Sequence, residues 1–211
     1  TRAGAVDLLF NLHGFVTSLR AAFRRVSEGV LQDAVEQLSR ELGRDDPLTY
    51  PPERALQFIA SRDNRLAGVG DEVFDSVKTT LQQGLEAGDT MNQLADRVRA
   101  QFNEMSRGRA RRIAMTETAA AYGTARQDGM RQAGVEWKRW LNSGGDNVRE
   151  AHMEANNQTV PVDSPFQVGG EELMHPGDPS GRPDNVINCH CVAVAVASPD
   201  DGLNTEAPPN A

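Results

Sequence analysis

The character of the chain changes near Gly134, and this change restricts the fold more than any other feature of the sequence. Before it, apolar residues recur every three or four positions, which is the spacing of one face of a helix. After it, Gly, Pro, Asp and Asn dominate, and eight of the eleven prolines lie beyond residue 160. We therefore expect an α+β protein, in which a helical N-terminal part precedes a small, loop-rich β subdomain.

In the helical part, the apolar spacing and its interruptions define separate helices. Breaks fall in the Gly- and Pro-containing stretch 43–52 and at Gly88, because Pro cannot continue a helix and Gly commonly ends one. Thr90 followed by Gln93 fits a capping box at a helix start, and Gly134 is the expected stop of an Ala-rich last helix. Helices are thus predicted over residues 8–42, 53–61, 69–85, 90–102 and 107–132.

The β part has short strands and few large apolar residues. Strands are predicted at 135–142, 158–162 and 191–197, where residues alternate or valines gather. A core this thin usually needs a disulfide or a metal ion for stability.

Both cysteines of the chain, Cys189 and Cys191, lie in this part with His190 between them. A disulfide between residues this close would close a strained ring, so a secreted disulfide scaffold is excluded. With His152 and His175 they offer thiolate and imidazole, the usual ligands of a structural zinc ion, which needs four. Two buried thiols explain the same spacing, because Cys often packs as a small hydrophobe. On a strand, both would point to the same side.

Charge is unevenly distributed along the sequence. Residues 143–211 carry a net charge of −9, whereas the whole chain carries −8. Residues 97–112 contain six arginines and one acid, Glu104. This cluster can neutralise nucleic-acid phosphates, although a solvated helix face or ion pairs with the acidic part explain it as well. The candidate nucleic-acid-binding residues are Arg97, Arg107, Arg109, Arg111 and Arg112.

Three stretches, in this order, resemble the phage Mu F-like family of minor head proteins, which carry the phage head morphogenesis domain. They are "AGDTMNQLADRVRAQF" with "RARRIAMTETAAAYGTARQDGMRQAGV", then "WKRWLNSGGDNVREAHMEANNQTVPVDSPF", then "HPGDPSGRPDNVINCHC". The likeness covers about Glu72 to Val194. Two positions depart from the family's pattern, since His190 stands where Arg is usual and Asn157 where Gly is common.

This resemblance implies a minor capsid protein of a tailed phage that acts near the portal vertex in head assembly and in DNA packaging or delivery. The implied location is the virion, and the host cytoplasm during assembly. The implied partners are the portal protein, the major capsid or scaffold protein, or both. Packaged double-stranded DNA is a further partner in the alternative in which the arginine cluster of residues 97–112 binds it. No apolar run approaches membrane-spanning length, so we expect no membrane partner, and we expect no small-molecule substrate.

The resemblance also implies a zinc site at His152, Cys189 and Cys191. Asp178 and His175 are the candidates for a fourth ligand, with Asp146 an outside one. The chain is then expected to divide into a helical, partner-binding arm (1–70), the helical part of the family domain (71–134), the loop-rich β part with the zinc site (135–197) and a disordered tail (198–211).

An enzyme is the remaining alternative. A zinc-dependent enzyme would use Glu117 or Glu154 as base, and Arg112 with Glu117 would be the start of an ADP-ribosyltransferase site. The sequence contains no H-E-x-x-H, G-x-S-x-G or P-loop motif. We therefore expect a structural and interaction protein rather than an enzyme.

Overall fold

The computed structural model of this chain describes residues 12–62, 76, 79–80, 83–84, 87–145 and 147–201. It divides into two compact units, each built from two separate segments. The first unit combines Thr1–Glu28 with Pro52–Ala114, and the second combines Gly29–Pro51 with Met115–Ala211. The expected α+β class is confirmed: α2 (Leu12–Glu41), α3 (Pro52–Ser61) and α5 (Met91–Gln132) precede a region of short strands.

The predicted helix ends are set by the expected local chemistry. Gly43 and Gly134 both have positive φ, 62° and 72°, the conformation that Gly adopts without steric cost after a helix. At the start of α5, the Gln93 amide donates to Thr90 Oγ1 at 3.4 Å and the Thr90 amide donates to Gln93 Oε1 at 2.8 Å. The capping box is therefore confirmed.

One expected break was wrong. The helices predicted over 90–102 and 107–132 form the single 42-residue helix α5. Residues 103–106 contain neither Gly nor Pro, so nothing there ends a helix. Gly108, just after this stretch, costs about 1 kcal/mol relative to Ala, which a helix of this length tolerates.

The helix predicted over 69–85 lies mostly outside the described residues. Those described there, at positions 76, 79–80 and 83–84, are helical. The expected stop near Gly88 agrees with its φ of 76° and with the Asp89 amide donating to the Gly84 carbonyl at 2.9 Å. In the same unit, Phe23 of α2 faces Phe58 of α3 with ring centroids 6.4 Å apart.

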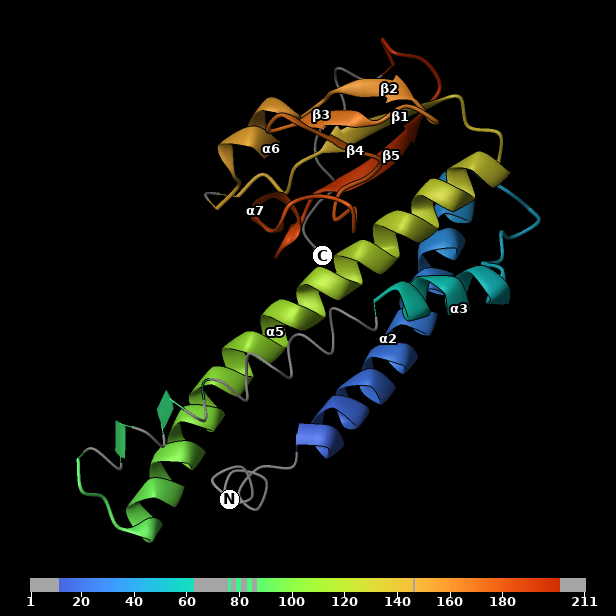
Figure 1. Cartoon of the computed structure of the whole chain (residues 1–211). Helices are drawn as coiled ribbons and strands as arrows, with labels where there is room; N and C mark the ends of the chain where they lie inside the picture. Colours follow the sequence, from blue (N-terminus) through green and yellow to red (C-terminus); the bar gives the residue numbers. More distant parts are fainter. Residues whose placement is uncertain are drawn as a thin grey trace. The chain divides into compact units, whose positions relative to one another are not determined.

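The second unit is built around an antiparallel sheet in the order β2-β1-β5 (Figure 1). Its strands are β1 (Trp137–Leu141), β2 (Thr159–Pro161) and β5 (Val192–Val196). All three were predicted, each slightly longer than observed. β1 is central, with Trp140 opposite Ala193 in the register with β5. It is buried on both faces, because Lys138, Arg139 and Trp140 are all buried.

Four short elements were not predicted. A second sheet pairs β3 (Phe166–Val168) with β4 (Glu171–Leu173), and α6 (Glu150–Glu154) and α7 (Pro183–Val186) are one-turn helices. The turn of the hairpin is Gly169–Gly170, with φ of 56° and 77°. Two Gly between short alternating runs are a hairpin signal. The stretch "FQVGGEEL" could therefore have predicted this hairpin.

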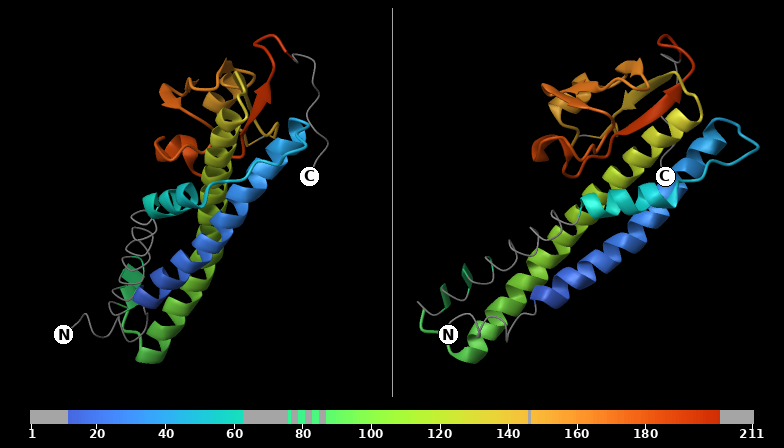
Figure 2. Two further views of the ribbon diagram at one scale, coloured as in Figure 1. Left: turned by 90° about the vertical axis from the view of Figure 1, so that its right-hand side faces the viewer. Right: turned by 45° about the vertical axis from the view of Figure 1, so that its right-hand side comes forward.

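Residues 115–132 of α5 form the central helix of the second unit. Figures 1 and 2 show this part of α5 running beside β5. Arg126 joins it to both neighbours. Its Nε donates to the Ala193 carbonyl of β5 at 3.0 Å, and its Nη1 and Nη2 reach the two carboxylate oxygens of Glu41 in α2 at 3.1 and 2.5 Å. None of the described helices is long and apolar enough to span a membrane.

A helical glycine lets the loop after β4 lie directly on α5. A Cβ at Gly123 would come within 2.4 Å of His175 Nδ1 and 2.5 Å of the Pro176 carbonyl oxygen. On the loop side, a Cβ at Gly177 would lie 3.0 Å from the Ala119 backbone, and Gly177 has a φ of 73°. Both glycines are needed for this close approach.

We expect Gly123→Ala to lower the free energy of unfolding by about 1–3 kcal/mol, because the added methyl group forces the loop away from α5. The matched control is Gly29→Ala in α2, where nothing lies within 4 Å of the added carbon. That change should stabilise the protein by about 1 kcal/mol. Urea unfolding of both variants tests this, and a Gly123→Ala protein as stable as wild type would contradict the packing.

Lys138 is a fully buried cation between the sheet and α5. Its Nζ donates to Gln127 Oε1 at 2.9 Å and to the Met174 carbonyl at 2.7 Å, and lies 5.0 Å from the centre of the Phe166 ring. Burial, followed by the positive charge of Arg131, lowers the pKa of Lys138 from 10.5 to about 8.

The shift predicts how stability depends on pH. Between about pH 8 and 10.5 the unfolded chain holds the Lys138 proton more firmly than the folded protein does, so the stability contribution of this group rises with pH. We expect the difference in unfolding free energy between wild type and Lys138→Met to shift in favour of wild type as pH rises through this window. Urea titrations at several pH values measure it, and a pH-independent difference would rule out the shift.

Candidate metal centre

His152 is held in place by the short helix α6 and by Trp140. The His152 amide donates to the Arg149 carbonyl at 2.9 Å in the first turn of α6. Its imidazole meets the Trp140 indole edge-on, with ring centroids 5.5 Å apart and an interplanar angle of 77°. Trp140 is itself fully buried against Phe166. The ring therefore has a fixed orientation on the inner side of the domain.

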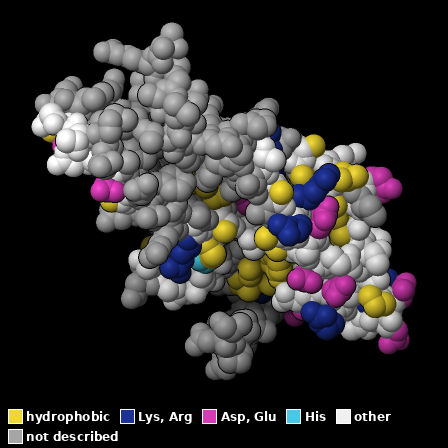
Figure 3. Space-filling model, turned by 90° about the horizontal axis from the view of Figure 1, so that it is seen from below, with side chains coloured by type: hydrophobic (Ala, Val, Ile, Leu, Met, Phe, Trp, Pro, Cys, Tyr) yellow, Lys and Arg dark blue, Asp and Glu magenta, His cyan; other side chains and the backbone are white. Residues whose placement is uncertain are grey.

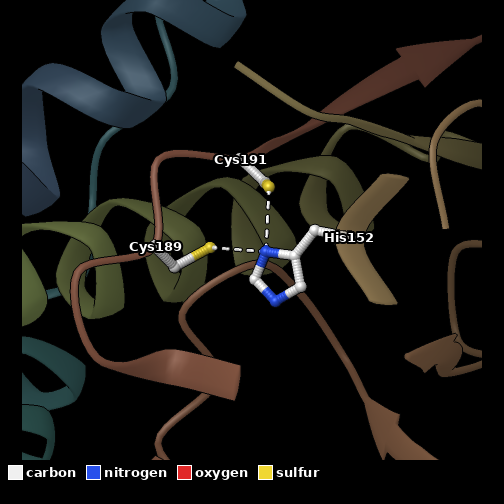
Figure 4. A group of neighbouring side chains, drawn as sticks. All are labelled: His152, Cys189 and Cys191. Atoms are coloured by element: carbon white, nitrogen blue, oxygen red, sulfur yellow. Dashed lines mark hydrogen bonds between the residues drawn. The ribbon is translucent and has the colours of Figure 1, made fainter. Parts of the chain in front are cut away.

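The two cysteines lie in the loop between α7 and β5. A strand beginning at Cys191 was expected, but β5 begins at Val192, and Asn188 has a φ of 56°, which no strand residue adopts. Both sulfur atoms nevertheless point to His152 Nδ1, as Figure 4 shows. The distances from Nδ1 are 3.9 Å to Cys189 Sγ and 3.3 Å to Cys191 Sγ.

These three side chains form a group that fits a metal ion. Their donor atoms all lie within 4.8 Å of one another. A tetrahedral zinc ion with ordinary bond lengths holds its sulfur and nitrogen ligands about 3.6 Å apart, close to the distances seen. The exposed fractions are 2% for His152, 2% for Cys189 and 8% for Cys191. Buried sulfur and imidazole donors in this arrangement are typical of zinc rather than of Mg²⁺ or Ca²⁺.

The two thiols do not titrate independently. The hydrogen bond between them, and then the one to His152, lowers the pKa of Cys189 to about 4 against the opposing effect of burial. The same hydrogen bond, burial and the charge of Cys189 raise the pKa of Cys191. One thiolate therefore forms at the expense of the other, and a bound cation would favour ionisation of both.

Two buried side-chain nitrogens near this group, His152 Nε2 and Trp140 Nε1, have no hydrogen-bond partner within the described part of the chain. The indole N–H still lowers the pKa of Cys191.

The other candidate ligands lie elsewhere. Among the described residues, neither His175 nor Asp178 belongs to the group around His152. His175 Nδ1 lies 3.0 Å from the Pro176 carbonyl and its Nε2 lies 3.3 Å from Thr124 Oγ1; burial lowers its pKa. His190 is exposed, and Asp146 lies outside the described residues.

Asp178 uses its carboxylate to hold its own loop. It accepts hydrogen bonds from the Met174 amide at 2.7 Å and from Ser180 N and Oγ at 2.9 and 2.7 Å. Burial alone would raise the pKa of Asp178, but the charge of His175 and these hydrogen bonds outweigh it, so the pKa is lowered. Its role in the structure is that of a loop anchor.

The arginine cluster is only partly described. Arg97 forms an ion pair with Asp89, Arg111 and Arg112 are exposed on α5, and the side chains of Arg107 and Arg109 lie outside the description. On the face shown in Figure 3, described basic and acidic side chains are interspersed. The candidate bases Glu117 and Glu154 are not part of the described metal-binding group.

A comparison with known families matches residues 75–194 to the model described as phage Mu protein F like protein. The chain belongs to the phage Mu F-like family. All three members of the His–Cys–Cys group fall inside the matched segment. Asn157, which stands where the family commonly has Gly, has a φ of 65°, a conformation that Asn tolerates better than most residues. The Mu F-like domain thus keeps the turn before Gln158 despite the substitution.

One curated relative of this Mu F-like protein is the uncharacterized protein YqbB of Bacillus subtilis (strain 168). It is 28% identical over 180 residues, which cover 81% of this chain and 59% of the relative. The chain thus spans a little under two thirds of the relative's length. No solved structure matches the chain.

Replacing Cys189 by Ser should weaken zinc binding and loosen the segment from Trp137 onward, because Ser is a poor zinc ligand. We expect about one zinc ion per wild-type chain by elemental analysis, with chelation or Cys189→Ser exposing this segment to protease while the helices survive. His190→Gln is the matched control, since His190 lies between the cysteines but outside the group. Unchanged protease resistance in Cys189→Ser would contradict a stabilising metal.

Proposed function

We propose that this chain is a minor head protein of a tailed phage, which acts in head assembly near the portal vertex and in DNA packaging or delivery. The match of residues 75–194 to the Mu F-like family carries this proposal. Membership of the family points to phage head morphogenesis, to other phage head proteins as partners and to the virion as location. The finer assignment to the portal or to the major capsid or scaffold protein rests on the family resemblance.

The Mu F-like domain is proposed to bind one structural zinc ion through His152, Cys189 and Cys191. When bound, the ion would crosslink α6 to the loop before β5. The burial of all three donors supports a structural role, since catalytic zinc sites keep a position open to substrate. This assignment also favours a head protein over a zinc-dependent enzyme.

DNA binding through the arginine cluster is the less supported alternative. The Arg97 guanidinium is already paired with Asp89, and both sit in a chain with a net charge of −8. A phosphate that binds Arg97 would have to displace the Asp89 carboxylate. The proposal therefore assigns any role in DNA packaging to contacts with other head proteins.

The proposal predicts a defect in particle formation when the gene is interrupted. A stop codon early in the gene, in the phage that encodes this chain, should reduce infectious particles by at least tenfold, with empty or unstable heads in electron micrographs. Supplying the full chain from a plasmid should restore the yield. A normal yield of infectious, DNA-filled heads without this protein would overturn the proposal.

Binding to the proposed head-protein partners can be tested separately. Full-length chain, coexpressed with the portal protein of the same phage, should co-elute with the portal assembly in size-exclusion chromatography. Coexpression with the major capsid protein and with the scaffold protein tests the other two partners. Separate elution in all three experiments would contradict direct docking on the head.

A further inference from the structure

The peptide group between Ile187 and Asn188, immediately before the cysteine loop, is held from both sides. Arg149 Nη2 donates to the Ile187 carbonyl oxygen, and the Asn188 amide donates to Thr116 Oγ1 at 3.0 Å. The carbonyl and N–H of a trans peptide point in opposite directions. Two partners on opposite sides therefore fix the rotation of this peptide plane about the chain.

We infer that Arg149 and Thr116 are positioning residues of the metal centre, which together clamp this peptide so that Cys189 and Cys191 face His152. The inference rests on the proposed zinc site and adds to it the residues that preorganise its ligands. Neither residue contributes a donor atom to the group of three. Both act through the backbone of the loop that carries the sulfurs.

The clamped peptide controls the direction of the loop because Asn188 follows it in an unusual conformation. Asn188 has a φ of 56°, a left-handed conformation that is uncommon outside Gly and costs free energy even where Asn tolerates it. An unclamped loop would relax toward ordinary extended conformations, and the direction of Cys189, the next residue, would change with it. The hydrogen bond to Thr116 opposes this relaxation.

At its other end the cysteine loop is fixed by the sheet. Val192, directly after Cys191, pairs with Leu141 in the β1–β5 register. The loop of Cys189, His190 and Cys191 is therefore short and anchored at both ends, by the clamp and by β5. Its sulfur atoms remain near His152 Nδ1 as long as both anchors are in place.

Arg149 connects the two ligand-bearing segments directly. Its backbone carbonyl accepts the amides of His152 and Met153, both at 2.9 Å, as the N-cap residue of α6, and its side chain makes no cap hydrogen bond. That side chain reaches the cysteine loop instead.

Thr116 connects the same peptide to the main scaffold of the unit. It is buried on α5, ten residues before Arg126, which joins α5 to β5 through Ala193. Both ends of the cysteine loop are thus hydrogen-bonded to the same helix, α5, through Thr116 at one end and through Arg126 at the other. Residues that orient metal ligands in this way typically contribute about 10- to 100-fold to metal affinity.

The test compares paired substitutions in the full chain with zinc as the probe. Thr116→Val removes the hydroxyl at constant shape, whereas Thr116→Ser keeps it. Arg149→Met removes the guanidinium and keeps most of the stem. We expect Thr116→Val and Arg149→Met each to lower zinc affinity about tenfold or more, measured by competition with a chromophoric chelator, and Thr116→Ser to stay near wild type.

Two further readouts separate positioning from general destabilisation. Since both hydrogen bonds hold one peptide, the double variant should lose less affinity than the product of the single losses. In the metal-free protein, Thr116→Val should speed hydrogen exchange at the Asn188 amide. Gly123→Ala, which strains another part of the same unit, should lower stability without lowering zinc affinity.

The outcomes distinguish this inference from the zinc assignment. Wild-type zinc affinity in both Thr116→Val and Arg149→Met, in a protein that does bind zinc, would overturn the clamp and leave the zinc site standing. An equal loss of affinity in Gly123→Ala would reduce the clamp to a general stability effect and overturn it as well. Absence of zinc binding in wild type would remove the metal site and the positioning role together.

Discussion

The buried guanidinium of Arg126 is the contact on which the second unit most depends. It binds both carboxylate oxygens of Glu41 and the backbone of Ala193, so a single side chain joins α2, α5 and β5. The Tyr122 ring, 5.6 Å from its central carbon, covers one face. A buried charge is tolerated only when paired and hydrogen-bonded, so these segments must meet in one arrangement. Ala193 lies two residues after Cys191, and the same contact therefore fixes the end of the cysteine loop.

The metal centre is an extension of this scaffold rather than an independent module. α6 and α7 are single turns, and β2, β3 and β4 have three residues each, too short to be stable alone. They are held by α5 through Gly123 and Thr116, and by the edge-to-face contacts that Trp140 makes with His152 and Phe166. Zinc would add a second crosslink between α6 and the loop before β5, beside the hydrogen bond from the Arg149 side chain to the Ile187 carbonyl.

Features decided by local chemistry were readable from the sequence, and features decided by packing were not. The helix ends at Gly43 and Gly134 and the cap at Thr90 follow from backbone rules that act within a few residues. The burial of Lys138 does not follow from such local rules, because the alternation of residues in β1 shows only that Lys138 lies on the same face as Trp140. Its two acceptors, Gln127 and the Met174 carbonyl, come from distant segments.

The candidate site shows the same division. His152, Cys189 and Cys191 were chosen through ligand chemistry and a family resemblance, and the structure brings them together. Asp178 and His175 were candidates for the fourth ligand, but their polar atoms make hydrogen bonds within the loop that lies on α5. The sequence shows which side chains can act as metal ligands, whereas the direction in which those side chains point depends on turns such as the one at Asn188. That turn is set by Thr116, 72 residues earlier in the chain, and no spacing rule connects the two.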